Sequence, residues 1–254
     1  MTVAVHHVID GPAGGPPLVM LGSLGTTLDM WRPQLAALTR HHRVIRVDHR
    51  GHDGAPVPAG PYRIDDLGAD LLALLDTLGE ERVRFCGLSL GGMVGMWLAA
   101  HAPERISRMV LLCTSAYLPP AGRWLDRAAQ VRSAGTASIA VAVVSRWFTD
   151  DYRAADPARL RHWHDMLAGM PAEGYAGCCE SIATMDLRPV LPKITADTLV
   201  IAATDDSAIP PAHGGEIVRG IAGSRLSVIG PAAHLANVER ADEVSSLILA
   251  QLDE

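Results

Sequence analysis

The 254-residue sequence is poor in features that mark several protein classes. It has four cysteines, at positions 86, 113, 178 and 179, and aromatic residues make up only 4% of the chain. These spacings exclude a disulfide framework, and the adjacent Cys178 and Cys179 lack the spacing of a metal site. Cys86 and Cys113 fall in expected buried strands, where free thiols pack as small hydrophobic groups. We therefore expect all four to be reduced, which favours the cytoplasm.

Membranes and nucleic acids are not expected partners. No apolar run is long enough to cross a bilayer, and the first seven residues lack the basic start and apolar core of a signal peptide. Lys and Arg total 22 against 28 Asp and Glu, which gives a net charge of −6 without any basic block. Nucleic-acid binding normally needs such a block. The expected partner is a small-molecule substrate.

What the sequence does contain is an alternation of strand and helix patterns. Short apolar segments are followed by segments with helical spacing, as at residues 64–78, where leucines recur every three or four positions. The expected strands are residues 3–9, 17–21, 43–48, 82–86, 108–113, 198–203 and 225–229. The expected helices are residues 64–78, 90–100, 124–133, 136–148, 157–167, 172–184 and 241–252. This alternation predicts an α/β fold with a mostly parallel central sheet flanked by helices.

The alternation is interrupted once, from residue 118 to residue 188, where only helical patterns occur. We expect this segment to be a helical lid inserted after the sixth parallel-type strand. The core would then consist of residues 1–117 and 189–254, so that the chain is one domain with an insertion. A lid at this place would cover the carboxyl ends of the strands, where parallel sheets carry their functional loops.

The strongest chemical signal is the motif G-x-S-x-G from Gly87 to Gly91. It stands between an apolar strand and an apolar helix, which is the setting of a nucleophile elbow. There the serine occupies a strained turn, and the glycines allow neighbouring backbones to approach. The N-terminus of the following helix directs free N–H groups toward an anion beside Ser89. Ser89 is therefore the candidate nucleophile.

Partners for this serine follow two later strands. Asp205 and Asp206 come after the strand at residues 198–203, and His234 comes after the strand at residues 225–229. The order Ser, Asp, His is that of α/β-hydrolases. We choose Asp206 over Asp205 because A-x-x-D-x-x-x-P, ending at Pro210, matches the G-x-x-D-x-x-x-P loop of that fold. Of the eleven histidines, only His234 has the position that a catalytic base requires.

Acyl transfer also requires two donors for the developing oxyanion. The N–H of Leu90, directly after the nucleophile, is one candidate. The other is the N–H of Leu24, in the loop after the strand at residues 17–21. The loop motif D-x-R-G-H follows a third strand, and we expect it to brace the Leu24 loop through Arg50 and His52.

Recognisable motifs extend along nearly the whole chain, at residues 20–33, 48–52, 60–62, 86–92, 145–148, 171–179 and 232–239. Together these segments resemble the 3-oxoadipate enol-lactonase family of α/β-hydrolases. The lid is the more specific part, because the serine and histidine motifs are shared by many hydrolases. The sequence departs from the family pattern at residues 53–55, where Gly-x-Ser is commoner, and at Ala203, where Gly is commoner.

The resemblance implies hydrolysis of an enol-lactone to a 3-oxo-dicarboxylic acid in aromatic-compound breakdown. Ser89 would attack the ring carbonyl with His234 as its base, and Asp206 would fix the imidazole tautomer. The N–H groups of Leu24 and Leu90 would hold the oxyanion. No metal or organic cofactor is implied.

The substrate of that family carries a carboxylate, so the lid is expected to provide a cation. Arg146 is the candidate, and its neighbour Trp147 and the lid residue Trp124 are expected to pack against the apolar ring. The alternatives are a broad carboxylesterase, a cofactor-free haloperoxidase-like perhydrolase or a C–C bond hydrolase. A hydrolase-fold binding protein without activity is a further alternative.

Overall fold

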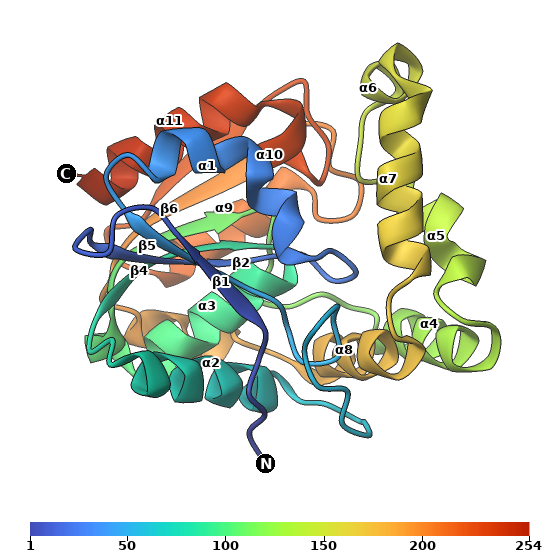
Figure 1. The fold of residues 1–254 in the computed structure, drawn as a ribbon, viewed down its shortest axis with the longest axis horizontal. Coiled ribbons are helices and arrows are strands. Elements are labelled where there is room, and N and C mark those ends of the chain that lie inside the picture. The colour runs from blue at the N-terminus through green and yellow to red at the C-terminus, as the bar shows by residue number, and fades with distance from the viewer. Residues whose placement is uncertain (254) are drawn as a thin grey trace.

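The computed structural model describes residues 1–253, apart from the side chain of Pro157. Its centre is a seven-stranded sheet with the order β1-β3-β2-β4-β5-β6-β7 (Figure 1). Only the edge strand β1 is antiparallel to its neighbour β3; the other pairs are parallel. The strands are β1 His7–Asp10, β2 Pro17–Leu21, β3 Arg43–Val47, β4 Val83–Leu88, β5 Ile106–Leu112, β6 Asp197–Ala203 and β7 Arg225–Ile229.

Helices connect these strands and cover both faces of the sheet. Helices α1 and α11 lie together on one face, and α2 and α3 lie on the other (Figure 1). In the described chain, no helix is long and apolar enough to cross a membrane. The α-helices are α1 Arg32–Leu38, α2 Ile64–Leu78, α3 Leu90–His101, α4 Ala121–Ala134, α5 Ala137–Val144, α6 Asp150–Ala155, α7 Pro157–Ala168, α8 Ala172–Thr184, α9 Pro211–Gly220, α10 Ala236–Glu239 and α11 Ala241–Asp253. Short 3-10 helices are η1 Leu28–Trp31, η2 Pro103–Arg105 and η3 Arg188–Lys193.

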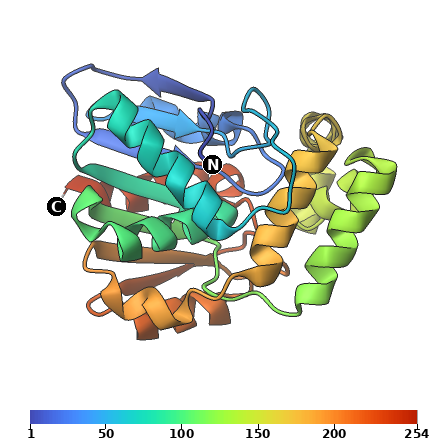
Figure 2. The ribbon, with the colours of Figure 1, turned by 90° about the horizontal axis from the view of Figure 1, so that it is seen from below.

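In the sequence, helices α4 to α8 all come between β5 and β6. In the fold they gather beside the sheet (Figure 2). Helices α4 and α8 pack against each other, as do α5 and α7. The expected fold class is confirmed, but its strand count is wrong. The helices follow β5, the fifth strand along the chain, because only five strands, the same five that the sequence pattern indicates, precede residue 118. The division at residues 117 and 189 stays a prediction.

Local sequence explains where the expected elements agree with the structure. The expected bounds of α2, α8 and β7 are those observed. Helix α2 ends at Gly79, whose φ of 72° is the left-handed conformation that glycine adopts without strain. Strand β1 is shorter than expected, because the N–H of Val3 donates to the Asp70 carboxylate on α2 instead of to a neighbouring strand.

Candidate active site

Ser89 occupies a strained turn between β4 and α3. Its φ of 56° and ψ of −116° are rare for a residue with a side chain. The turn is held by hydrogen bonds from Ser89 N to Leu112 O, 3.0 Å, and from Gly91 N to Gly22 O, 3.0 Å. A Cβ on Gly91 would overlap the carbonyl of Leu21, so only glycine permits this approach. The turn therefore directs the buried Ser89 side chain into a cavity at the carboxyl end of the sheet.

The histidine expected as the base is paired with an aspartate. His234 Nδ1 lies 2.8 Å from Asp206 Oδ2, and both side chains are buried. Asp206 Oδ1 accepts hydrogen bonds from the N–H groups of Ala208 and Ile209, each 2.9 Å. The neighbouring Asp205 is exposed and accepts from the Thr204 hydroxyl instead. Of the two aspartates, Asp206 is thus the one that can orient the imidazole.

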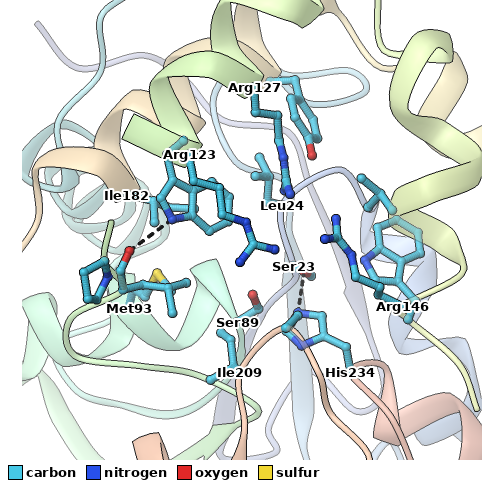
Figure 3. Close-up of a pocket in the computed structure, with 17 residues that line it drawn as sticks. Ser23, Leu24, Ser89, Met93, Arg123, Arg127, Arg146, Ile182, Ile209 and His234 are labelled. Carbon is cyan, nitrogen blue, oxygen red and sulfur yellow. Dashed lines mark hydrogen bonds between the residues drawn. The ribbon is translucent and has the colours of Figure 1, made fainter. Parts of the chain in front are cut away.

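His234 and Ser89 line one cavity, with Ser23 between the loops that carry them (Figure 3). His234 Nε2 lies 3.5 Å from Ser23 Oγ. Within the described residues no hydrogen bond joins Ser89 to His234, and in ligand-free enzymes such bonds commonly tighten only when substrate binds. The sequence interpretation had not singled out Ser23, although it directly precedes the proposed oxyanion residue Leu24.

The loop from Gly22 to Thr26 is held so that one backbone N–H remains free. Gly25 N donates to His52 Nε2, 2.9 Å, and Thr26 N donates to Ser23 O, 3.1 Å. Among residues 1–253, the N–H groups of Leu24 and Leu90 have no acceptor. Both can therefore donate to an oxygen in the cavity, which Leu24 itself lines.

Two buried histidines support this loop, but Arg50 does not. The bracing role expected of His52 is confirmed, and His49 Nε2 adds a second hydrogen bond, to Gly22 O, 2.9 Å. Arg50 instead forms a bidentate ion pair with Asp70 on α2, at 2.6 and 2.7 Å. Both side chains of this pair are buried, so the carboxylate compensates the charge of the guanidinium. The expectation for Arg50 was therefore wrong.

Burial keeps both histidines neutral. Desolvation lowers the pKa of His49 to about 4 and that of His52 to about 3. At neutral pH each ring nitrogen therefore has a fixed role. His49 Nε2 donates to Gly22 O, whereas His52 Nε2 accepts from Gly25 N and its Nδ1 donates to Arg50 O, 3.3 Å. The pair holds the loop at residues 22–26 without placing a charge beside it.

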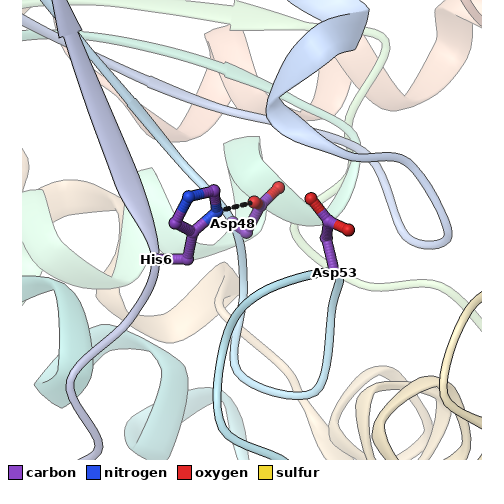
Figure 4. A group of neighbouring side chains, drawn as sticks. All are labelled: His6, Asp48 and Asp53. Atoms are coloured by element: carbon purple, nitrogen blue, oxygen red, sulfur yellow. Dashed lines mark hydrogen bonds and ion pairs between the residues drawn. The ribbon is translucent and has the colours of Figure 1, made fainter.

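A metal ion could be held in the described chain by His6, Asp48 and Asp53, whose ligand atoms lie within 4.8 Å of one another (Figure 4). None of the three lines the cavity. Asp48 already accepts hydrogen bonds from His6 Nδ1, 2.7 Å, and from Leu28 N, 2.7 Å. Because Leu28 follows the loop at residues 22–26, Asp48 also supports that loop.

The lid contributes cations and aromatic rings to the cavity. Arg146, Trp147 and Trp124, all expected here, line it together with Arg123 and Arg127, which the sequence interpretation missed (Figure 3). Positions 123 and 127 are four residues apart on α4, which is the spacing that puts two side chains on one face of a helix. That spacing was the signal available in the sequence.

The arginines that line the cavity repel one another, and Arg146 is also partly buried. The pKa of Arg146 is lowered, first by burial and then by the charges of Arg127 and Arg123. Trp147 is only 3% exposed and meets Trp163 edge-on. Trp124 donates its ring N–H to Leu118 O, 3.1 Å, and its ring face lies 4.8 Å from the guanidinium of Arg127. The cavity thus combines apolar walls with unusual positive charge.

Comparison with known proteins places this arrangement in a family. The family described as alpha/beta hydrolase fold matches residues 16–241. The 3-oxoadipate enol-lactonase 2 of Acinetobacter baylyi is 41% identical over 238 residues, which cover 94% of this chain and 89% of the relative. The chain belongs to the 3-oxoadipate enol-lactonase family of α/β-hydrolases.

Two further relatives show how much of this chain resembles known enol-lactonases and other hydrolases. The crystal structure of the enol-lactonase from Burkholderia xenovorans LB400 superimposes with a TM-score of 0.97 at 43% identity, covering 99% of this chain and 97% of that one. A putative carbamate hydrolase, RutD, of Stutzerimonas stutzeri is 30% identical over 258 residues, covering 98% of this chain and 97% of the relative. The resemblance therefore extends through the lid as well as the core.

Proposed function

We propose that this protein hydrolyses 3-oxoadipate enol-lactone to 3-oxoadipate, in the breakdown of aromatic compounds. The observation that carries the proposal is the cavity itself. It joins Ser89 and the paired His234 to a cluster of lid arginines suited to a carboxylated substrate. The similarity to two named 3-oxoadipate enol-lactonases supports the same substrate.

The first half-reaction forms an acyl-enzyme. Ser89 Oγ attacks the lactone carbonyl while His234 Nε2 takes the hydroxyl proton, and Asp206 stabilises the resulting imidazolium. The N–H groups of Leu24 and Leu90 hold the oxyanion. The ring C–O bond then breaks, and the proton on His234 passes to the departing enol oxygen. An enol is a good leaving group because it rearranges to the ketone.

The second half-reaction releases the acid. A water molecule gives a proton to His234 and attacks the Ser89 ester, and the same backbone N–H groups hold the second oxyanion. Collapse of this intermediate breaks the bond to Ser89 Oγ, which recovers its proton from His234. The balance is one lactone and one water giving one 3-oxo acid, with His234 carrying the proton in each step.

The lid selects the substrate in this proposal. Arg146 binds the free carboxylate of the lactone, because a partly buried guanidinium forms strong charge-assisted hydrogen bonds with it. Trp147 and Trp124 pack against the apolar part of the ring. The triad and the oxyanion loop would act on many esters, so specificity arises from these lid side chains.

A panel of substrates tests this function. Purified protein is given the enol-lactone, followed by loss of its ultraviolet absorbance, and in parallel p-nitrophenyl acetate, a simple alkyl carbamate and a peracid-forming mixture of acetate and peroxide. We expect kcat/KM for the enol-lactone to exceed the others by at least a hundred-fold. The carbamate is included because of the similarity to a putative carbamate hydrolase. Preference for another substrate would favour a carbamate hydrolase, a broad carboxylesterase or a perhydrolase.

A further inference from the structure

A second serine hydroxyl lies beside His234. Ser23 Oγ is 3.5 Å from His234 Nε2, and among residues 1–253 it has no other hydrogen-bond partner (Figure 3). Because the Asp206 carboxylate can only accept, Nδ1 of the imidazole carries the proton and Nε2 is free to accept one. In the ligand-free protein the Ser23 hydroxyl therefore donates to Nε2. The two half-reactions use Ser89 and leave this second hydroxyl without a role.

The backbone holds the Ser23 hydroxyl in place. Ser23 O accepts hydrogen bonds from Thr26 N, 3.1 Å, and from Thr26 Oγ1, 2.8 Å, while Ser23 N donates to the sulfur of Met30 at 3.3 Å. The residue cannot turn without breaking these contacts. It is only 2% exposed, yet it lines the same cavity as Ser89 and His234. The hydroxyl is thus a fixed part of the cavity wall, beside the nitrogen that takes and returns protons.

The distance between the two groups suits a bridging water molecule. Two atoms 3.5 Å apart share positions about 2.8 Å from both, which is an ordinary hydrogen-bond length. A water molecule at such a position gives one hydrogen to His234 Nε2 and the other to Ser23 Oγ, so that an oxygen lone pair stays free for attack. The next residue, Leu24, has the free N–H that can hold the oxyanion. One short loop can therefore hold both the water molecule and the oxygen of the group it attacks.

We propose that Ser23 positions the water molecule that releases the acid from Ser89. In this step one O–H bond of the water breaks, its proton passes to His234 Nε2, and the water oxygen bonds to the acyl carbon. The second hydrogen stays on that oxygen and is held by Ser23 Oγ, whose own proton is not transferred. The proposal rests on the acyl-enzyme of the proposed function, but not on the identity of the lactone.

Methanol tests this role, because it competes with water for the same acyl-enzyme and has only one O–H group. That hydrogen goes to His234, so methanol has none to give to Ser23. Ser23→Ala should therefore slow the attack of water on the acyl-enzyme more than the attack of methanol.

The measurement is the ratio of two products. The acyl-enzyme is formed from p-nitrophenyl acetate in buffer with a fixed methanol concentration, and acetate and methyl acetate are quantified. Their ratio is set after the acyl-enzyme has formed, so it does not depend on which half-reaction is slower. We expect the ratio of acetate to methyl acetate to fall by about three- to ten-fold in Ser23→Ala, the effect of one lost hydrogen bond. A ratio equal to that of the wild type would overturn the proposal, whatever the overall rate.

Two controls separate this role from a structural one. Thr26→Val removes a hydroxyl that holds the same loop but leaves Ser23 Oγ in place, so the product ratio should not change. Ethanol added beside methanol reports on space, since a variant that only made room would form ethyl acetate at the expense of methyl acetate. We expect the proportion of the two esters to stay constant in Ser23→Ala. An equal fall in Thr26→Val, or a marked gain of ethyl acetate in Ser23→Ala, would overturn the proposal.

Two outcomes separate this proposal from the proposed function. If the enol-lactone is not hydrolysed but the product ratio falls in Ser23→Ala, the role of Ser23 is supported and the proposed function fails. If the enol-lactone is hydrolysed but the ratio does not fall, the proposed function stands and the role of Ser23 fails.

Discussion

Asp206 and His234 are 28 positions apart in the chain, yet their side chains meet at 2.8 Å in a buried environment. Each follows the carboxyl end of a strand, Asp206 after β6 and His234 after β7, and these strands are parallel neighbours in the sheet. The second carboxylate oxygen of Asp206 accepts hydrogen bonds from two backbone N–H groups. Both oxygens of the carboxylate are therefore held in place, one by His234 and one by the backbone. The imidazole is therefore oriented before any substrate binds.

This pairing leads to a prediction that distinguishes adjacent aspartates. Asp206→Asn should lower kcat for the enol-lactone by about 10⁴-fold, because an amide favours the wrong imidazole tautomer. The matched control, Asp205→Asn, changes an exposed carboxylate that does not contact His234, and its effect should be below about ten-fold. Steady-state kinetics of both variants give the test. A larger loss for Asp205→Asn would mean that the loop has another register in solution.

Arg146 is predicted to act on charged substrates selectively. Arg146→Ala should lower kcat/KM for the enol-lactone by about ten- to a hundred-fold more than it lowers kcat/KM for p-nitrophenyl acetate, because one charge-assisted hydrogen bond contributes roughly 1.5–3 kcal/mol. Both substrates are measured on one preparation of each protein. Equal losses would show that Arg146 supports the lid fold and that another residue binds the carboxylate.

Asp48 should give stability an unusual dependence on pH. Burial raises the pKa of Asp48 to about 6, from an ordinary aspartate value of about 3.9. Between these values the folded protein binds a proton that the unfolded chain has released. The contribution of Asp48 to the free energy of unfolding therefore falls as pH rises through this window, by roughly 1–3 kcal/mol.

Comparison with Asp48→Asn isolates this effect from the other carboxylates. Urea unfolding of both proteins is measured at pH 4, 5, 6 and 7. The wild type should lose stability relative to the variant as pH rises. A difference that stays constant, or that changes in the opposite direction, would show that His6 keeps Asp48 ionised throughout.

Local pattern was sufficient to predict the sheet and the catalytic loops. The order of Ser89, Asp206 and His234, each after a strand, can be read directly, because parallel strands deliver their carboxyl ends to one edge. Helix α2 was predictable because its leucine spacing and terminal glycine agree. Helices α1, α6, α9 and α10 were not predicted, because they are short and their apolar spacing covers less than three turns.

Contacts between residues far apart in the chain could not be predicted from the sequence. Nothing local indicates that Arg50 pairs with Asp70 rather than with the oxyanion loop, or that His49 supports that loop. The depletion of acidic partners around Arg127 is likewise visible only once α4, α5 and α8 surround the same cavity. Such features depend on which side chains, far apart in the sequence, lie close together in the folded protein.

The most direct test of the account is the Ser89→Ala variant assayed with the enol-lactone. Circular dichroism and Tm should match the wild type, because the change removes one side-chain oxygen at the cavity wall. Loss of ultraviolet absorbance of the lactone should slow by at least 10⁴-fold, since nucleophile and base act as one unit. A folded variant that retains more than a tenth of wild-type kcat would contradict the serine mechanism.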